Sequence, residues 1–336
     1  MLQQTTVPAV AAYFARFLKA WPTVRDLADA SQDEVLTAWA GLGYYARARN
    51  LHAAAKRVAN ELGGRFPDTA EGLRMLPGVG EYTSGAIAAI AFNRREAAVD
   101  ANAERVLARL FAVEEALPKA KPRLRELCRS LLPQKRAGDF AQALMDLGSS
   151  ICTPKRPSCS RCPWSKDCEA LKRGIQQELP RKAAKPARPL KRGAAFVAYD
   201  RSGALLLVRR AENGLLGGMM QPPLGPWSER FPTSKEALLQ APFRAAWTKR
   251  IGIVRHGFTH FELELEVYVA ELSKRPSIGE FNAQWVRDLS SVALPTLMKK
   301  IIGHASNVQG DANLLAVTAR RQASRPCSST PSRRAR

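Results

Sequence analysis

The chain lacks any hydrophobic run long enough to span a membrane, and its 336 residues carry 30 acidic side chains against 52 lysines and arginines. The missing span argues against an integral helical membrane protein, and the first residues show no signal-peptide pattern. The shortage of acids leaves a formal net charge of +22. An excess of this size favours a polyanionic partner. We therefore expect a soluble protein that binds nucleic acid rather than a membrane.

Cysteine is also scarce, with six in the whole chain, but it is not evenly spread. Four cysteines follow one another in the spacing C-x6-C-x2-C-x5-C: Cys152, Cys159, Cys162 and Cys168. Such clustering suits a metal site in a reducing compartment better than a set of disulfides. Four thiolates hold either zinc or an iron–sulfur cluster, and the number of ligands does not separate the two.

Two glycines in a tight turn mark the stretch on which the helical part is centred, with the sequence LPGVG at residues 76–80. A helical segment follows at 82–92, and Asp100 and Asn102 precede another helical run. A glycine turn leaves backbone N–H groups bare, and a phosphate is their natural ligand. From the local pattern alone, however, Asp100 and Asn102 serve equally well as plain helix N-caps.

Residues 1–150 read as helices joined by short links, with capping-box patterns that begin at Ser31 and Asp68. Residues 41–52, with the sequence GLGYYARARNLH, mix two tyrosines with basic side chains. Aromatic rings beside arginines suit wedging between bases together with phosphate contacts. From the residues alone, a buried aromatic pair beside a solvated basic face is the simpler interpretation.

The pattern changes to β-structure from residue 193 onward. Apolar runs at 194–199 and 204–210 flank a hairpin signal, and 261–269 alternates apolar and polar residues as a half-buried strand does. Two further segments read as helices, 235–249 and 293–302. The sequence therefore predicts a second domain of α/β class.

The LPGVG turn, the string VDANAERVLAR and the cysteine spacing together resemble the helix-hairpin-helix, or endonuclease III, superfamily of DNA glycosylases. The strings MLQQT and GLGYYARARN resemble its MutY-type adenine DNA glycosylases. The resemblance implies a mostly α helix-hairpin-helix glycosylase domain with a [4Fe–4S] loop, followed by an α/β Nudix-like domain. The implied parts are a glycosylase domain at 1–150, a cluster loop held by the four cysteines at 151–170, a basic linker at 171–192, a Nudix-like lesion-recognition domain at 193–306 and a disordered basic tail at 307–336.

The same resemblance assigns roles to residues of the helical domain. It implies that the Asp100 carboxylate lies beside the sugar of the extruded nucleotide, with Tyr82 and Asn102 completing the catalytic group. Residues that contact DNA would be Gln4 and Tyr44 beside the lesion base, and Leu76, Gly78 and Gly80 in the hairpin. The bifunctional relatives carry a Schiff-base lysine at the position of Tyr82, so this chain should be a monofunctional glycosylase without lyase activity.

The Nudix-like domain shows both a match and two departures. Phe258, Thr259 and His260 match the family's loop that recognises 8-oxoguanine, where an aromatic ring wedges and a hydroxyl bonds the oxidised base. Leu216 stands where the family often has tryptophan. No glutamate-rich Nudix helix is present, so the domain lacks the carboxylates that would hold Mg²⁺ and should bind rather than hydrolyse nucleotides.

The implied function is excision of adenine from A:8-oxoguanine or A:G mispairs in double-stranded DNA, by a monomeric, cytoplasmic, nucleoid-associated enzyme of bacterial type. A catalytically defective lesion-binding protein and an endonuclease III-type glycosylase/lyase are the alternatives. A Nudix pyrophosphatase with a DNA-binding module is disfavoured by the missing carboxylates.

The first prediction concerns the general acid. The family's adenine-protonating glutamate lies two residues before the methionine of MLQQT, so it would precede Met1. General acid catalysis is typically worth ~10²–10⁴ in rate, so we expect the chain as given to be N-terminally truncated, poorly stable and nearly inactive. An in-frame upstream extension ending in Glu-Val should restore excision. Sequencing the DNA upstream of Met1 checks this, and an in-frame stop codon directly before Met1, or full excision by the 336-residue chain, would contradict it.

Overall fold

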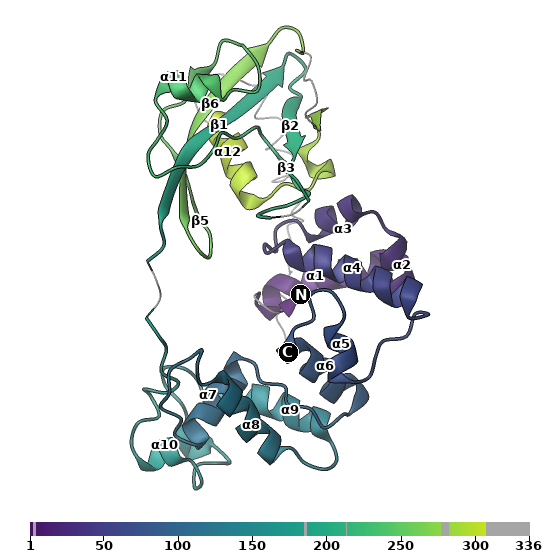
Figure 1. Cartoon of the computed structure of the whole chain (residues 1–336), viewed down its shortest axis with the longest axis vertical. Helices are drawn as coiled ribbons and strands as arrows, with labels where there is room; N and C mark the ends of the chain where they lie inside the picture. The colour runs from purple at the N-terminus through teal and green to yellow at the C-terminus, as the bar shows by residue number, and fades with distance from the viewer. Residues whose placement is uncertain (3–4, 185–186, 213, 277–281, 307–336) are drawn as a thin grey trace, which may run out of the picture. The chain divides into compact units, whose positions relative to one another are not determined.

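The computed structural model of the chain, shown in Figure 1, describes residues 1–2, 5–184, 187–212, 214–276 and 282–306. Gln4 and the expected tail at 307–336 lie outside the described residues. The chain divides into two compact units. The sheet unit comprises Met1–Ala20, Ala30–Arg49 and Ala187–Arg336, and the cluster unit comprises Trp21–Asp29 and Asn50–Pro186. Each is described by itself.

The sheet unit is built around the parallel pair of β1 (Leu190–Asp200) and β6 (Glu262–Leu272), which stay in register along their whole length. The sheet order is β3-β2-β1-β6-β4, with β5 on β6 and β7 on β2. The remaining strands are β2 (Leu205–Arg209), β3 (Met220–Gln221), β4 (Thr248–Lys249), β5 (Val254–Gly257) and β7 (Ala283–Val286). The predicted hairpin is confirmed, because β1 and β2 pair antiparallel across residues 200–204.

Successive side chains of β6 point to opposite faces of the sheet, and each face carries apolar residues. Leu263, Leu265 and Val267 contribute to a core that includes α12 (Thr296–Ser306). Tyr268 joins a smaller cluster on the other face with Ala237 of α11 (Ser234–Leu239). The predicted α/β class of this domain is therefore confirmed.

The expectation of a helix over 235–249 is wrong for most of its length. Helix α11 ends at Leu239, and Thr248–Lys249 forms β4 against β6. Pro242 explains the stop, because proline has no N–H for the helix ladder and restricts the residue before it to extended conformations.

Two N-terminal helices belong to the sheet unit, α1 (Val7–Ala20) and α3 (Gln32–Trp39). They pack through an edge-to-face contact between Phe17 and Trp39, with 5.8 Å between the ring centroids. Ser31 and Glu34 form the predicted capping box at the start of α3.

The cluster unit is helical, as the sequence predicts for this region. Helix α4 (Ala46–Glu61) continues into it from the sheet unit. Its other helices are α2 (Val24–Asp29), α5 (Ala70–Arg74), α6 (Glu81–Phe92), α7 (Ala101–Leu110), α8 (Lys121–Leu131), α9 (Ala137–Asp146) and α10 (Glu169–Lys172), with a π-helical turn at Leu147–Ile151 and a 3₁₀ turn at Cys159–Arg161. Among the described residues, no helix is both long and apolar enough to cross a membrane.

Two details of this unit differ from the expectation. Thr69, not Asp68, caps α5, because the Thr69 hydroxyl accepts from Gly72 N while Asp68 pairs with Arg94. The expected linker also begins as folded structure: Leu179 is 2% exposed, and the backbone of Leu117 bonds residues on either side of Lys182. The basic composition of this segment did not reveal its structure, because backbone hydrogen bonds to Leu117 hold it in an extended, strand-like form.

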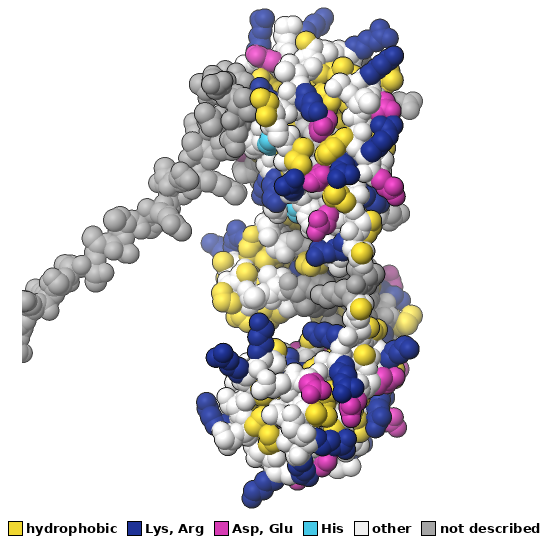
Figure 2. Space-filling view, turned by 90° about the vertical axis from the view of Figure 1, so that its left-hand side faces the viewer, with side chains coloured by type: hydrophobic (Ala, Val, Ile, Leu, Met, Phe, Trp, Pro, Cys, Tyr) yellow, Lys and Arg dark blue, Asp and Glu magenta, His cyan; other side chains and the backbone are white. Residues whose placement is uncertain are grey.

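Basic side chains are prominent on the face shown in Figure 2, where lysine and arginine are spread over the described parts of the chain and acidic groups are fewer. This distribution fits the formal net charge of +22. A surface with an excess of positive charge attracts a polyanion, so it supports nucleic-acid binding without locating the site.

Packing of α6 on α9 generates the second prediction. A Cβ atom added at Gly138 would lie 2.6 Å from the carbonyl oxygen of Ala89, so the two helix backbones are in direct contact. Gly138→Ala should therefore destabilise the folded chain by about 1–3 kcal/mol, since overpacking forces the helices apart. Gly303→Ala, within α12, is the control, because nothing lies within 4 Å of a Cβ there. Urea unfolding followed by circular dichroism measures both, and equal midpoints would contradict the prediction.

Candidate active site and cysteine loop

The glycine turn before α6 presents open backbone donors. Gly78 has φ of +75°, and a Cβ there would lie 2.6 Å from the Asn50 side chain, so only glycine fits. Gly80 is the N-cap of α6 and supplies no capping side chain. The N–H groups of Glu81 and Tyr82, the first two residues of α6, are therefore available to an anion, with the positive end of the helix dipole behind them.

Leu76 plays a different part from the two glycines. It is 4% exposed and belongs to a core cluster with Val58 and Leu73. Its side chain anchors the turn, so contact with DNA at this position would have to come from the backbone.

Tyr82 lies in the first turn of α6 and is 36% exposed. Its hydroxyl is 3.8 Å from Met145 Sδ. Burial raises the pKa of Tyr82, and the negative charge of Asp100 raises it further. The phenol therefore keeps its proton at neutral pH, and its hydroxyl points to Met145 Sδ while feeling the charge of Asp100.

Asp100 is the N-cap of α7, and three donors fix its carboxylate. Oδ1 accepts from the backbone N–H groups of Asn102 at 2.9 Å and Ala103 at 2.8 Å, and Oδ2 accepts from Asn102 Nδ2 at 2.9 Å. The capping interpretation is thus correct, and it does not compete with a chemical role. A half-buried carboxylate held in one orientation is suited to stabilising positive charge.

Hydrogen bonds continue from Asn102 toward the cysteine loop. Asn102 Oδ1 accepts from Arg105 Nη2 at 3.0 Å, and Arg105 Nε donates to the carbonyl oxygen of Cys152 at 2.7 Å. Arg105 also donates to the carbonyl oxygen of Gly148, where a Cβ atom would lie 2.6 Å from Asn102 Cβ. One side chain therefore joins the Asp100–Asn102 pair to the start of the loop.

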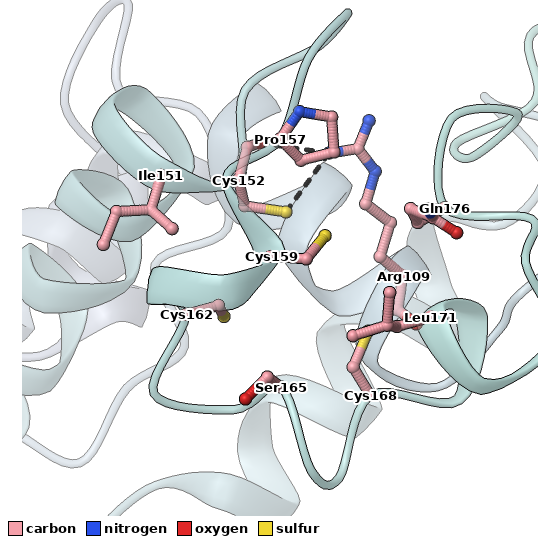
Figure 3. A pocket seen from close by; sticks show the side chains of 10 residues that line it. All are labelled: Arg109, Ile151, Cys152, Pro157, Cys159, Cys162, Ser165, Cys168, Leu171 and Gln176. Carbon is pink, nitrogen blue, oxygen red and sulfur yellow. Dashed lines mark hydrogen bonds between the residues drawn. The ribbon is translucent and has the colours of Figure 1, made fainter.

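The four cysteines line one cavity, which has a volume of about 300 Å³ including the space open to solvent (Figure 3). All four are free thiols, and Arg109 closes one side, with its Nη1 3.2 Å from Cys152 Sγ. Burial raises the pKa of Cys159, and the charges of the other three cysteines raise it further. Crowded thiols of this kind ionise readily only with a cation between them.

The donor set of this cavity fits a metal group in its chemistry. Four sulfur ligands from one loop are the set that iron–sulfur clusters and structural zinc use. Among the described residues, however, no three His, Cys, Asp or Glu side chains are close enough together to form a finished metal site. The cavity nevertheless brings the four sulfur ligands of the loop around one space.

The expected recognition loop joins β5 to β6. The Phe258 ring packs against Phe261 at 4.7 Å, His256 at 4.6 Å and Trp227 at 6.3 Å between centroids. Thr259 and His260 at the tip are exposed. Phe258 is thus held among aromatic rings of its own domain, and the tip residues are the ones that project.

Tyr44 and Leu216 are the remaining positions singled out by sequence. Tyr44 is 50% exposed, has φ of +50° and carries the Arg47 guanidinium 5.3 Å from its ring centroid. A strained, exposed tyrosine with a cation over its ring is available to a ligand. Leu216 packs against the core of the sheet unit, as a larger apolar residue would.

Sequence reasoning missed Arg105 and Arg109. Both lie within α7, and their exposed fractions are 8% and 2%. Their signal was available: two arginines at i and i+4 on a short helix whose other residues from Ala103 to Leu110 are almost all apolar. Buried arginine requires partners, and the neighbouring cysteine loop supplies them.

Comparison with known proteins gives a consistent result. Residues 1–134 match the HhH-GPD superfamily base excision DNA repair protein family, and residues 194–304 match the NUDIX domain family. The human protein named adenine DNA glycosylase is 36% identical over 90% of this chain and 66% of its own length, and that of Buchnera aphidicola from Acyrthosiphon pisum is 30% identical over 90% of this chain and 87% of its own. A thermostable thymine-DNA glycosylase structure, 33% identical, superposes with a TM-score of 0.48 over 51% of this chain and 80% of that one.

The Arg105 contacts generate the third prediction. Arg105→Met should remove the donor from four acceptors, the Asn102 amide and the carbonyls of Ala101, Gly148 and Cys152. Leaving a buried acceptor unsatisfied costs about 1–3 kcal/mol, so the urea midpoint should fall accordingly. Arg74→Met is the control, since Arg74 forms only exposed or local contacts on α5. A midpoint for Arg105→Met that equals the control's would show that the link is not needed for stability.

Proposed function

Because this chain belongs to the adenine DNA glycosylase family, we propose that it hydrolyses the N-glycosidic bond of adenine mispaired with 8-oxoguanine or guanine in double-stranded DNA. The observation that carries the proposal is the Asp100 carboxylate, which three donors hold in one orientation. The four free thiols support a reducing compartment such as the cytoplasm, and we expect the enzyme to act as a monomer.

Binding begins with the DNA backbone. The backbone N–H groups at the start of α6, directly after Gly80, would hold one DNA phosphate, which fixes the duplex beside α6. The target adenine must leave the stack before its sugar can reach a buried group. Tyr44 is exposed and aromatic, which supports a role in filling or probing the stack. The family resemblance gives Gln4 the same role.

Bond cleavage develops positive charge on the sugar, as in an oxocarbenium ion. We assign Asp100 to stabilise that charge, because its two capping bonds and the Asn102 amide hold it still. Tyr82 donates a hydrogen bond in the same region, and Asn102 orients the carboxylate. A tyrosine cannot form an imine, so Tyr82 argues against the endonuclease III-type lyase alternative.

The cysteine loop is proposed to hold a [4Fe–4S] cluster through Cys152, Cys159, Cys162 and Cys168. Such a group would cross-link the loop and supply one-electron redox chemistry. The chain's own residues support the fit through a four-sulfur donor set in one cavity and a buried arginine against Cys152 Sγ.

The fourth prediction tests the reaction. Asp100→Asn should lower single-turnover adenine release from an A:8-oxoguanine duplex by about 10²-fold or more, because the carboxylate acts only as the bond breaks. Asparagine caps helices about as well as aspartate, so the fold and duplex affinity should be retained. Asp139→Asn, at an exposed ion pair, is the control. Release is followed for hours in the chain as given and in a variant extended before Met1 by Glu-Val. No release from either form, or full release by Asp100→Asn, would reject the assignment.

The fifth prediction concerns lesion recognition. We propose that Phe258, Thr259 and His260 tune the choice of the base opposite adenine and leave excision itself intact. Replacing the exposed pair Thr259 and His260 by alanine should reduce the preference for 8-oxoguanine over guanine by about 1–3 kcal/mol in binding. Parallel titrations with the two duplexes measure this, and an unchanged ratio would remove the loop from recognition. Ser202→Ala, in the exposed β1–β2 turn, serves as the control.

A further inference from the structure

Arg109 is a buried cation of the cluster unit whose guanidinium nitrogens all form hydrogen bonds. The residue is 2% exposed, and every one of its guanidinium nitrogens donates to the segment that follows α9. Nε donates to the carbonyl oxygen of Leu179 at 3.0 Å, Nη1 to that of Thr153 at 2.8 Å and Nη2 to that of Pro154 at 3.0 Å. Nη1 also lies 3.3 Å from the carbonyl oxygen of Cys152 and 3.2 Å from its Sγ.

Among the described residues, the positive charge of Arg109 has no carboxylate partner among its hydrogen bonds. Within the part of the chain that the structure describes, the hydrogen bonds of Arg109 go to carbonyl oxygens and one sulfur, with no carboxylate among them. A buried guanidinium is costly unless an anion compensates it. The facing groups that can carry negative charge are the cysteine sulfurs of the cavity, and the one that accepts from Arg109 Nη1 is Cys152 Sγ. Arg105, bonded to the same residue's carbonyl oxygen, adds a second cation.

A four-thiolate [4Fe–4S] group supplies the missing negative charge, since its usual oxidised form carries a net charge of about −2. We propose that Arg109 is the buried counter-ion and sulfur hydrogen-bond donor of this cluster, and that it sets the cluster's reduction potential and its resistance to oxidation. The inference rests on the proposed cluster. It goes beyond it by giving a role in the cluster's chemistry to Arg109, which is not one of the cluster's ligands. Arg109 is a positioning residue that acts through Cys152 and the loop carbonyls.

The direction of the effect follows from electrostatics. A positive charge and an N–H···S bond stabilise the more negative, electron-richer state of the cluster. Their removal makes loss of one electron easier. With ferricyanide as the oxidant, that electron reduces ferricyanide to ferrocyanide, and the oxidised cluster then releases iron and sulfide.

The experiment compares four forms of the full chain. Anaerobic wild-type protein is first assayed for iron and acid-labile sulfide, with close to four iron atoms expected per chain for this ligand set. Arg109→Met removes both charge and donors, while Arg109→Lys keeps the charge without the planar fork. Arg95→Met is the matched control, because Arg95 also donates through Nε and Nη2 to a carbonyl oxygen, that of Leu132, away from the loop.

Two readouts are taken: the decay of the cluster's visible absorbance in ferricyanide, and the midpoint potential by spectroelectrochemistry. Decay in Arg109→Met should be about 10-fold faster or more, with a lower midpoint potential. Arg109→Lys should fall between it and the wild type, and Arg95→Met should match the wild type. Circular dichroism verifies folding, and if Arg109→Met does not fold, Arg109→Lys decides alone.

Wild-type decay and potential in Arg109→Lys and in folded Arg109→Met would overturn the inference. Zinc without sulfide in the wild-type protein would overturn it together with the proposed cluster, while leaving adenine excision to be judged by the Asp100→Asn comparison. A changed potential with unchanged adenine release would support Arg109's role and separate it from the catalytic group.

Discussion

Helix α7 holds the active-site candidate and the cysteine loop through hydrogen bonds from a single short segment. Asp100 caps its N-terminus, Asn102 bonds Asp100, and the two buried arginines reach from its side into the loop backbone. These bonds lie largely out of water, where an unmade hydrogen bond is expensive. The position of the carboxylate and the course of the loop are therefore set by the same helix, and neither is independent of the other.

Close backbone approaches reinforce that helix. Gly148 leaves room for Asn102, as Gly85 does for the carbonyl oxygen of Ala97 and Gly138 for that of Ala89. Each glycine removes a Cβ that would lie 2.6 Å from its neighbour. Packing at this distance limits how far α6, α7 and the turn at 147–151 can shift, and rigidity of that kind is what a preorganised electrostatic site needs.

The recognition role that we propose for the sheet unit would depend on a different kind of contact. Its loop between β5 and β6 is stiffened by aromatic contacts rather than by charge, with Trp227, His256 and Phe261 around Phe258. The root of the loop is therefore held by packing, while Thr259 and His260 at its tip are exposed. A rigid loop loses little conformational entropy when it meets a ligand, so small polar groups at its tip can discriminate between bases.

The sequence by itself determined the two structural classes, the β1–β2 hairpin, the capping box at Ser31, the four-cysteine spacing and the glycine turn at 76–80, because these are local patterns with a local cause. The resemblance on those motifs supplied the candidate residues. Tertiary structure decided what local pattern cannot encode: that the helix after residue 234 stops early, that the supposed linker folds back onto Leu117, that Leu76 is core and Phe258 is packed, and that Arg105 and Arg109 are buried against Cys152. Their partners lie more than forty residues away along the chain, and burial of an arginine depends on which distant carbonyl and sulfur atoms the fold brings to it.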